Sequence, residues 1–210
     1  MKLAYIVTGV VIFLLHGCNN RVCHCLVKHE IVETNDSIIS NWNKQGWWSE
    51  IGMESASQSE NDFYRLTIFP SWNNSTVTQY TLENKKGNAK MSIEEYQQNY
   101  STEKFTLKKK GNAKNLHLAP DKWIEIDTLA ESKCFWVMPV ESGEQYLDGV
   151  SWLLEAKKRD ISICSQKQYH IVSRVAKDSI FFTICNDILK LGNSSLKEQD
   201  SLLDISWRTD

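Results

Sequence analysis

The chain has 210 residues, with 24 lysines and arginines against 26 aspartates and glutamates and a formal net charge of −2. This balance predicts no nucleic-acid partner, because nucleic-acid binders depend on clustered cations. The two dense basic runs, Lys108–Lys110 and Lys157–Arg159, are interpreted as solvated residues at turns. The length suits one folded domain with a core of ordinary size.

The N-terminal segment has the order of a secretion signal. Lys2 precedes an apolar run from Leu3 to Leu15, and Gly17 stands just before Cys18. This order resembles that of bacterial lipoprotein signals. The run is shorter than the about 20 apolar residues of a membrane-spanning helix. We therefore expect residues 1–17 to be a signal peptide. Cys18 is expected to carry a lipid such as palmitate, which anchors the protein to a membrane of the bacterial cell envelope.

Residues 18–60 are predicted to form a tether and an irregular segment. Small polar residues fill positions 54–61, whereas Trp42, Trp47 and Trp48 are costly to leave in water. We therefore expect part of this segment to pack back on the domain.

The same segment holds the densest set of soft metal ligands, Cys23, His24, Cys25 and His29. Thiolate with imidazole suits zinc or monovalent copper. The set lacks Cys-x-x-Cys spacing and lies in the expected tether, so oxidation or a link to another chain explains these thiols as well. The sequence predicts no resident metal or cofactor.

Regular structure is expected just after the tether. β-Branched and aromatic residues predict a strand over Phe63–Phe69, before Pro70, and composition together with alternation predicts another over Thr76–Leu82. Residues Ala89–Ser92 extend the predicted sheet, and residues 93–99 are predicted to turn helical.

The hexapeptide Lys-Lys-Gly-Asn-Ala-Lys occurs twice, at Lys85–Lys90 and at Lys109–Lys114. Each copy contains Gly-Asn, a pair that tolerates positive φ. Both copies are predicted to be hairpin turns with solvated lysines. A duplicated binding loop is the alternative.

The second half predicts two helices and more strands. Helical spacing with Pro120 in the first turn indicates a helix over Leu118–Lys133. Strands are predicted over Gly149–Glu155, Asp160–Cys164 and Tyr169–Val175, a second helix over Ser179–Leu191, a stop at Gly192-Asn193, and a flexible tail over 193–210. The predicted fold is α+β, a curved antiparallel β-sheet with two main helices and an irregular N-terminal segment, with residues 61–192 as the domain.

Two blocks carry a family resemblance. The segment Leu147–Glu155 reads Leu-Asp-Gly-Val-Ser-Trp-Leu-Leu-Glu, and Tyr169–Arg174 reads Tyr-His-Ile-Val-Ser-Arg. In this order and spacing, the chain resembles a family of small uncharacterised bacterial proteins over about residues 61–192. Lys157-Lys158 departs from the glycine-rich turn of that pattern. The resemblance implies one β-rich α+β domain and supplies no mechanism.

Six cysteines are present. A lipid on Cys18 leaves an odd number, so at least one is a thiol or pairs with another chain. A bridge between Cys164 and Cys185 is one expectation, and buried thiols are the other.

Several polar residues near the predicted strands are candidates for chemistry. Asp148 and Glu155 are the acid or base candidates, and Arg65 or Arg174 is expected to bind an anionic group. Strand alternation puts His170 and Arg174 on one side, and Glu155 is expected to pair with Arg174 if their strands are neighbours. The alternative is a structural cross-strand ion pair with a turn at Asp148.

Signatures of common hydrolases and nucleotide enzymes are missing from the sequence. Trp47, Trp48 and Trp72 lie in loop-like stretches and are candidates for an exposed binding patch. Three tryptophans in apolar runs are predicted to be core: Trp123, Trp136 and Trp152.

These features favour a lipid-anchored envelope protein that acts as a non-catalytic binding or interaction module. Its expected partners are the membrane, through Cys18, and an envelope protein or glycan. An envelope enzyme and an immunity or inhibitor protein are the alternatives. Asp-Ser followed by an aliphatic residue resembles an envelope O-glycosylation pattern, which makes Ser37 and Ser201 candidate acceptors.

Overall fold

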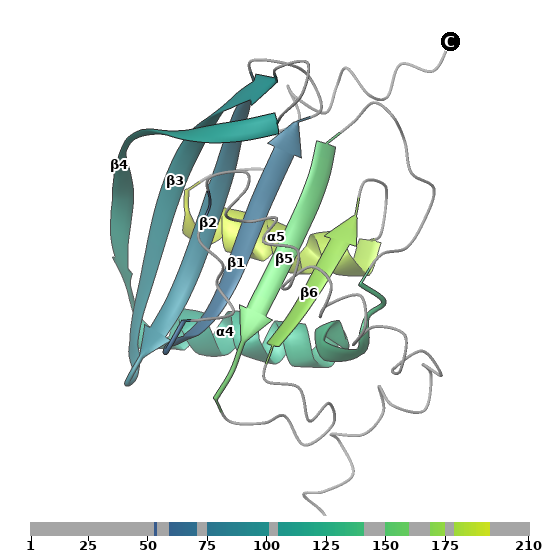
Figure 1. The fold of residues 1–210 in the computed structure, drawn as a ribbon. Helices are drawn as coiled ribbons and strands as arrows, with labels where there is room; N and C mark the ends of the chain where they lie inside the picture. Colours follow the sequence, from purple (N-terminus) through teal and green to yellow (C-terminus); the bar gives the residue numbers. More distant parts are fainter. Residues whose placement is uncertain are drawn as a thin grey trace, which may run out of the picture.

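A computed structural model describes residues 53, 59–70, 75–100, 105–140, 150–159, 169–174 and 179–193 (Figure 1). The described residues form a six-stranded sheet in the order β4-β3-β2-β1-β5-β6, with every neighbouring pair antiparallel. The elements are β1 Asp62–Pro70, β2 Thr76–Lys85, β3 Asn88–Tyr100, β4 Phe105–Leu118, α4 Pro120–Ser132, η3 Phe135–Val137, β5 Val150–Lys157, β6 Tyr169–Arg174 and α5 Ser179–Leu191. The predicted α+β class is confirmed.

Helices α4 and α5 cover one face of the sheet (Figure 1). Alternation in β1 directs Tyr64, Leu66 and Ile68 into this helix-covered core, where they are fully or almost fully buried. The core also takes the predicted core tryptophans, whose exposed fractions are 7% for Trp123, 2% for Trp136 and 1% for Trp152.

The opposite face carries a smaller apolar cluster. Val77, Tyr96, Leu107, Leu153 and Ile171 pack there, joined by side chains from outside the strands at positions 53 and 140. No helix of the described ranges covers this face, and we call it the helix-free face (Figure 1). The two faces together account for the nearly continuous burial along β1.

Strand β3 corrects one prediction. Residues 93–99 belong to a single 13-residue strand instead of turning helical. Pairing on both sides decides the outcome, since Ile93 lies opposite Tyr80 of β2 and Lys114 of β4. Local helix propensity in this stretch is outweighed by that pairing and by the packing of Tyr96 on the helix-free face.

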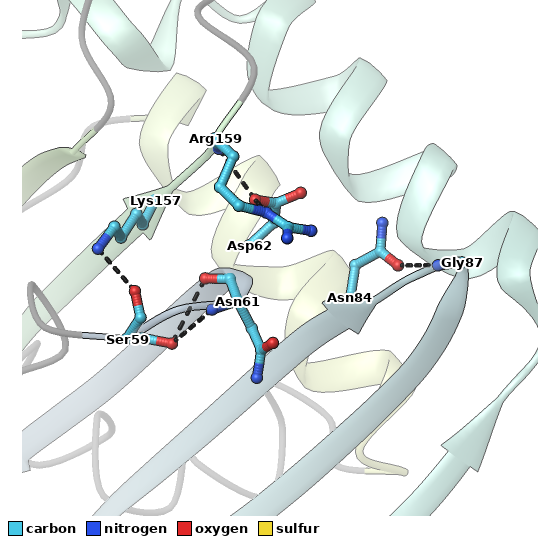
Figure 2. Close-up of polar contacts among 7 residues, drawn as sticks. All are labelled: Ser59, Asn61, Asp62, Asn84, Gly87, Lys157 and Arg159. Atoms are coloured by element: carbon cyan, nitrogen blue, oxygen red, sulfur yellow. Dashed lines mark hydrogen bonds and ion pairs between the residues drawn. The ribbon is translucent and has the colours of Figure 1, made fainter.

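The two copies of the hexapeptide have different structures. The first forms the β2–β3 turn, with φ of 53° at Lys86 and 84° at Gly87, and Asn84 Oδ1 accepts a hydrogen bond from the Gly87 amide at 3.0 Å (Figure 2). The second copy was predicted to be a turn, and that prediction is wrong. It lies inside β4, where the register against β3 shifts between Ile93 and Glu95, and Gly111 with φ of 64° accommodates this irregularity.

Both predicted helices are present. Pro120 opens α4 at its first residue, and α5 ends just before Asn193, which has a φ of 58°. Within the described residues, none of the helices has the length and apolar character needed to cross a membrane.

Candidate functional site

A buried polar cluster lies on the helix-free face, formed by Arg65 of β1, Glu155 of β5 and Tyr169 of β6. Arg65 lies directly opposite Glu155 in the register, and Tyr169 is on the next strand. Arg65 contacts Glu155 Oε2 through Nε at 2.6 Å and through Nη2 at 2.5 Å. The Tyr169 hydroxyl donates to Glu155 Oε1 at 2.5 Å. Both carboxylate oxygens of Glu155 are therefore engaged.

Burial sets the electrostatics of this cluster. Glu155 is fully buried and Arg65 is 6% exposed. Burial, together with the charge and hydrogen bond of Glu155, raises the pKa of Tyr169 well above its ordinary value. Tyr169 therefore acts as a hydrogen-bond donor to the carboxylate. A phenolate base at this position is disfavoured.

Other paired polar groups continue across the same face. Gln79 Nε2 of β2 donates a hydrogen bond to Thr67 Oγ1 of β1 at 3.2 Å. On β3, Glu94 accepts from the Tyr96 hydroxyl at 2.7 Å and from Lys109 of β4. Burial acts to raise the pKa of Glu94, but the hydrogen bonds from Lys109 and Tyr96 lower it overall. Glu94 and Glu155 are thus both matched by nearby donors.

His170 and Arg174 lie on the other, helix-covered face. His170 Nε2 is 3.0 Å from the Met138 carbonyl oxygen, and Arg174 donates to the carbonyl oxygens of Val140 at 3.2 Å and Pro139 at 2.9 Å. The Ser173 amide also donates to the Val140 carbonyl at 2.7 Å. The two side chains therefore fasten the segment that follows η3 to β6.

The predicted pairing of Glu155 with Arg174 is wrong. Strands β5 and β6 are neighbours, but the register places Arg174 opposite Trp152 and Glu155 opposite Ile171. Because side chains alternate along a strand, Glu155 and Arg174 point to opposite faces. The placement of His170 and Arg174 on one side is confirmed, and the cross-strand ion pair exists with Arg65 as the partner.

The remaining site predictions concern metal ligands and residues outside the described ranges. Among the described residues, no group of three or more His, Cys, Asp or Glu side chains is arranged to hold a metal ion. Several predicted residues lie outside the described ranges: Cys18, Cys23, His24, Cys25, His29, Ser37, Trp42, Trp47, Trp48, Trp72, Asp148, Cys164 and Ser201, as does the predicted strand Asp160–Cys164.

The predicted bridge between Cys164 and Cys185 is corrected by the state of Cys185. Cys185 is a fully buried thiol in the core side of α5, as the alternative expectation held. Cys134 is the disulfide-bonded cysteine of the described residues. It follows α4 in a left-handed conformation, with φ of 59°. The sequence offered no pattern that singled it out.

A second polar cluster was missed by sequence reasoning. The Tyr64 hydroxyl donates to Asp127 Oδ1 at 2.7 Å, and Lys158 Nζ lies 2.8 Å from Asp127 Oδ1 and 3.1 Å from Glu131 Oε1. Burial, followed by the charge of Asp127, raises the pKa of Tyr64. Two signals were available, namely a tyrosine in a buried strand, which needs a partner for its hydroxyl, and two acids one turn apart on a helix.

The residues around Lys158 are also bound. The predicted solvation is wrong for Lys157 and Lys158, which are half-buried, whereas Arg159 is exposed and lies in a bend just after β5. Lys157 Nζ donates a hydrogen bond to the Ser59 carbonyl oxygen at 2.6 Å (Figure 2). Asp62 Oδ1 accepts two hydrogen bonds from Arg159, one from the backbone amide at 2.9 Å and one from the side-chain Nε at 3.2 Å. These contacts fasten the end of β5 to the start of β1. The predicted turn at Lys108–Lys110 is wrong, because these residues lie within β4.

No protein-family model matches the chain, and searches of curated proteins and of solved structures find no match. The family resemblance therefore stays a prediction.

Proposed function

We propose that this chain is a non-catalytic binding or protein-interaction module, held to the bacterial cell envelope by a lipid on Cys18. The observation that carries the non-catalytic part is the separation of the polar candidates. Glu155 and Arg65 neutralise each other on one face of the sheet, whereas His170 and Arg174 bind carbonyl groups on the other. An acid, a base and an anion-binding arginine need to converge on one substrate, and these residues do not.

The envelope part of the proposal rests on two supports. The order of residues from Lys2 to Cys18 resembles that of a lipoprotein signal. The disulfide at Cys134 fits an oxidising compartment outside the cytoplasm, where such bonds persist.

Partner capture tests the non-catalytic role. We propose that Trp47 and Trp48 contribute to the contact surface, because tryptophan is enriched at interfaces. Cross-linking in intact cells, followed by mass spectrometry, is expected to recover the same envelope partner or glycan with wild type and with Arg65→Met/Glu155→Leu. This double variant removes the acid and its cation together, a change that buried pairs often tolerate. Trp47→Ala/Trp48→Ala is expected to lose the partner.

An opposite pattern would contradict the proposal. If wild type converts a small molecule in an envelope extract, and a folded Arg65→Met/Glu155→Leu variant does not, the protein is an enzyme that uses the polar cluster. Circular dichroism of each variant ensures that only folded proteins are compared.

A further inference from the structure

Strand β4 is an exposed, lysine-rich edge of the sheet. It is the first strand in the sheet order, so only β3 pairs with it among the described residues (Figure 1). Lys108, Lys109, Lys110 and Lys114 are all exposed along its length. Edge lysines oppose pairing with another strand, because a new neighbour would have to desolvate them. A partner that adds a strand is therefore disfavoured at this edge.

Positive charge gathers at this edge and is mostly left unneutralised. Residues 76–118 hold eight lysines and four glutamates and no aspartate or arginine, in a chain whose net charge is −2. Lys109 and Lys110 have carboxylates nearby, Glu94 and Glu95. The other exposed lysines of β2 to β4 have no ion pair within the described ranges, and we call this set the lysine edge: Lys85, Lys86, Lys90, Lys108 and Lys114.

The register spreads these charges along the β4 edge and the adjoining β2–β3 turn. Lys85 and Lys86 stand at the β2–β3 turn, and Lys90 lies opposite His117 near the end of β4. Lys108 and Lys114 follow along β4 on either side of the irregularity at Gly111. An ammonium on a flexible stem contacts a phosphate as an independent point charge, without a fixed directional geometry. A row of such groups suits an extended anionic surface better than a small ligand.

We propose that the lysine edge docks on an anionic phospholipid surface. This inference rests on the proposed lipid anchor, because a chain tethered at Cys18 keeps a membrane within reach. Juxtamembrane lysines are attracted to anionic leaflets, and a basic patch adds a second attachment to a lipid chain. The lysine edge would thereby orient the domain, with β4 toward the membrane.

Vesicle binding by residues 18–210 carrying Cys18→Ser tests the surface without the lipid. The chain is expected to sediment with vesicles in which about a third of the lipid is phosphatidylglycerol, and not with pure phosphatidylcholine vesicles. Removing lysines with the triple variant Lys86→Gln/Lys108→Gln/Lys114→Gln is expected to lower the partition coefficient about fivefold per lysine. Added salt is expected to weaken binding, since exposed charges are screened.

A matched control removes three lysines from the helical layer, in Lys122→Gln/Lys133→Gln/Lys190→Gln. This control is expected to retain most of the binding, although its net charge changes by the same amount. Equal losses in the two triple variants would overturn the proposal, and so would the absence of binding to anionic vesicles or specific capture of an acidic protein instead. Because Cys18 carries no lipid here, failure of this test is distinguishable from failure of the anchor, which fractionation of the wild-type chain measures.

Discussion

The ion pair between Arg65 and Glu155 gives the sharpest test of the helix-free face. Arg65→Met removes the cation and leaves the fully buried Glu155 carboxylate with the Tyr169 hydroxyl as its remaining donor in the cluster. Removing one partner of a buried pair costs about 3–5 kcal/mol of unfolding free energy. For a domain whose total stability is about 5–15 kcal/mol, this is a large fraction.

Urea denaturation followed by circular dichroism measures the effect. A loss of about 4 kcal/mol, with a slope of about 2 kcal/mol per molar urea, lowers the midpoint by about 2 M. Arg65→Met/Glu155→Leu is expected to recover most of the loss, because it removes the uncompensated charge. Lys190→Met breaks the exposed pair with Asp187 and serves as the control, with an expected cost below about 1 kcal/mol. If Arg65→Met shifts the midpoint no more than Lys190→Met, the reasoning about a buried pair is refuted.

Three further predictions address other parts of the fold. Lys158→Met leaves Asp127 of α4 without the half-buried ammonium. Thermal unfolding is expected to show a loss of about 1–3 kcal/mol of unfolding free energy. An unchanged midpoint would contradict the role of this cluster. Tyr64 and Tyr169 have raised pKa values in the folded chain, so their contribution to stability is complete below the unfolded pKa of about 10 and is lost as pH rises above it. Tyrosinate absorbance is expected to show these two groups ionising only together with alkaline unfolding, and free titration of either in the native state would be inconsistent with its burial. Gly111→Ala is expected to cost about 1–2 kcal/mol at its left-handed position and Gly111→Asn less, as judged by urea midpoints; equal stability of wild type and Gly111→Ala would exclude a conformational requirement there.

The strands and helices that sequence reasoning predicted well are those with a strong local composition or period. Phe63–Phe69 has the β-branched and aromatic composition of a strand, and Ser179–Leu191 has the apolar spacing of a helix. Residues 93–99 lack such a period. Their state depends on hydrogen bonds to β2 and β4, which no local pattern reveals.

Sequence reasoning predicted which residues belong to the candidate site better than it predicted which of them pair. Glu155 and Arg65 were both chosen, but the sequence does not state that β1 lies between β2 and β5. That strand order brings Arg65 beside Glu155, and the register of β5 with β6 turns Arg174 away. One residue of register reverses the face of every side chain in a strand, so pairing needs the tertiary structure.

The lipidation state of Cys18 decides whether the chain is anchored to a membrane. Intact mass and membrane fractionation compare the wild-type chain with Cys18→Ser in a bacterium that processes lipoproteins. We expect a wild-type product that begins at Cys18, carries added acyl mass and sediments with membranes, and a Cys18→Ser product that keeps residues 1–17 and carries no acyl mass. An unacylated wild-type protein in the soluble fraction would contradict the anchor and, with it, the proposed envelope role.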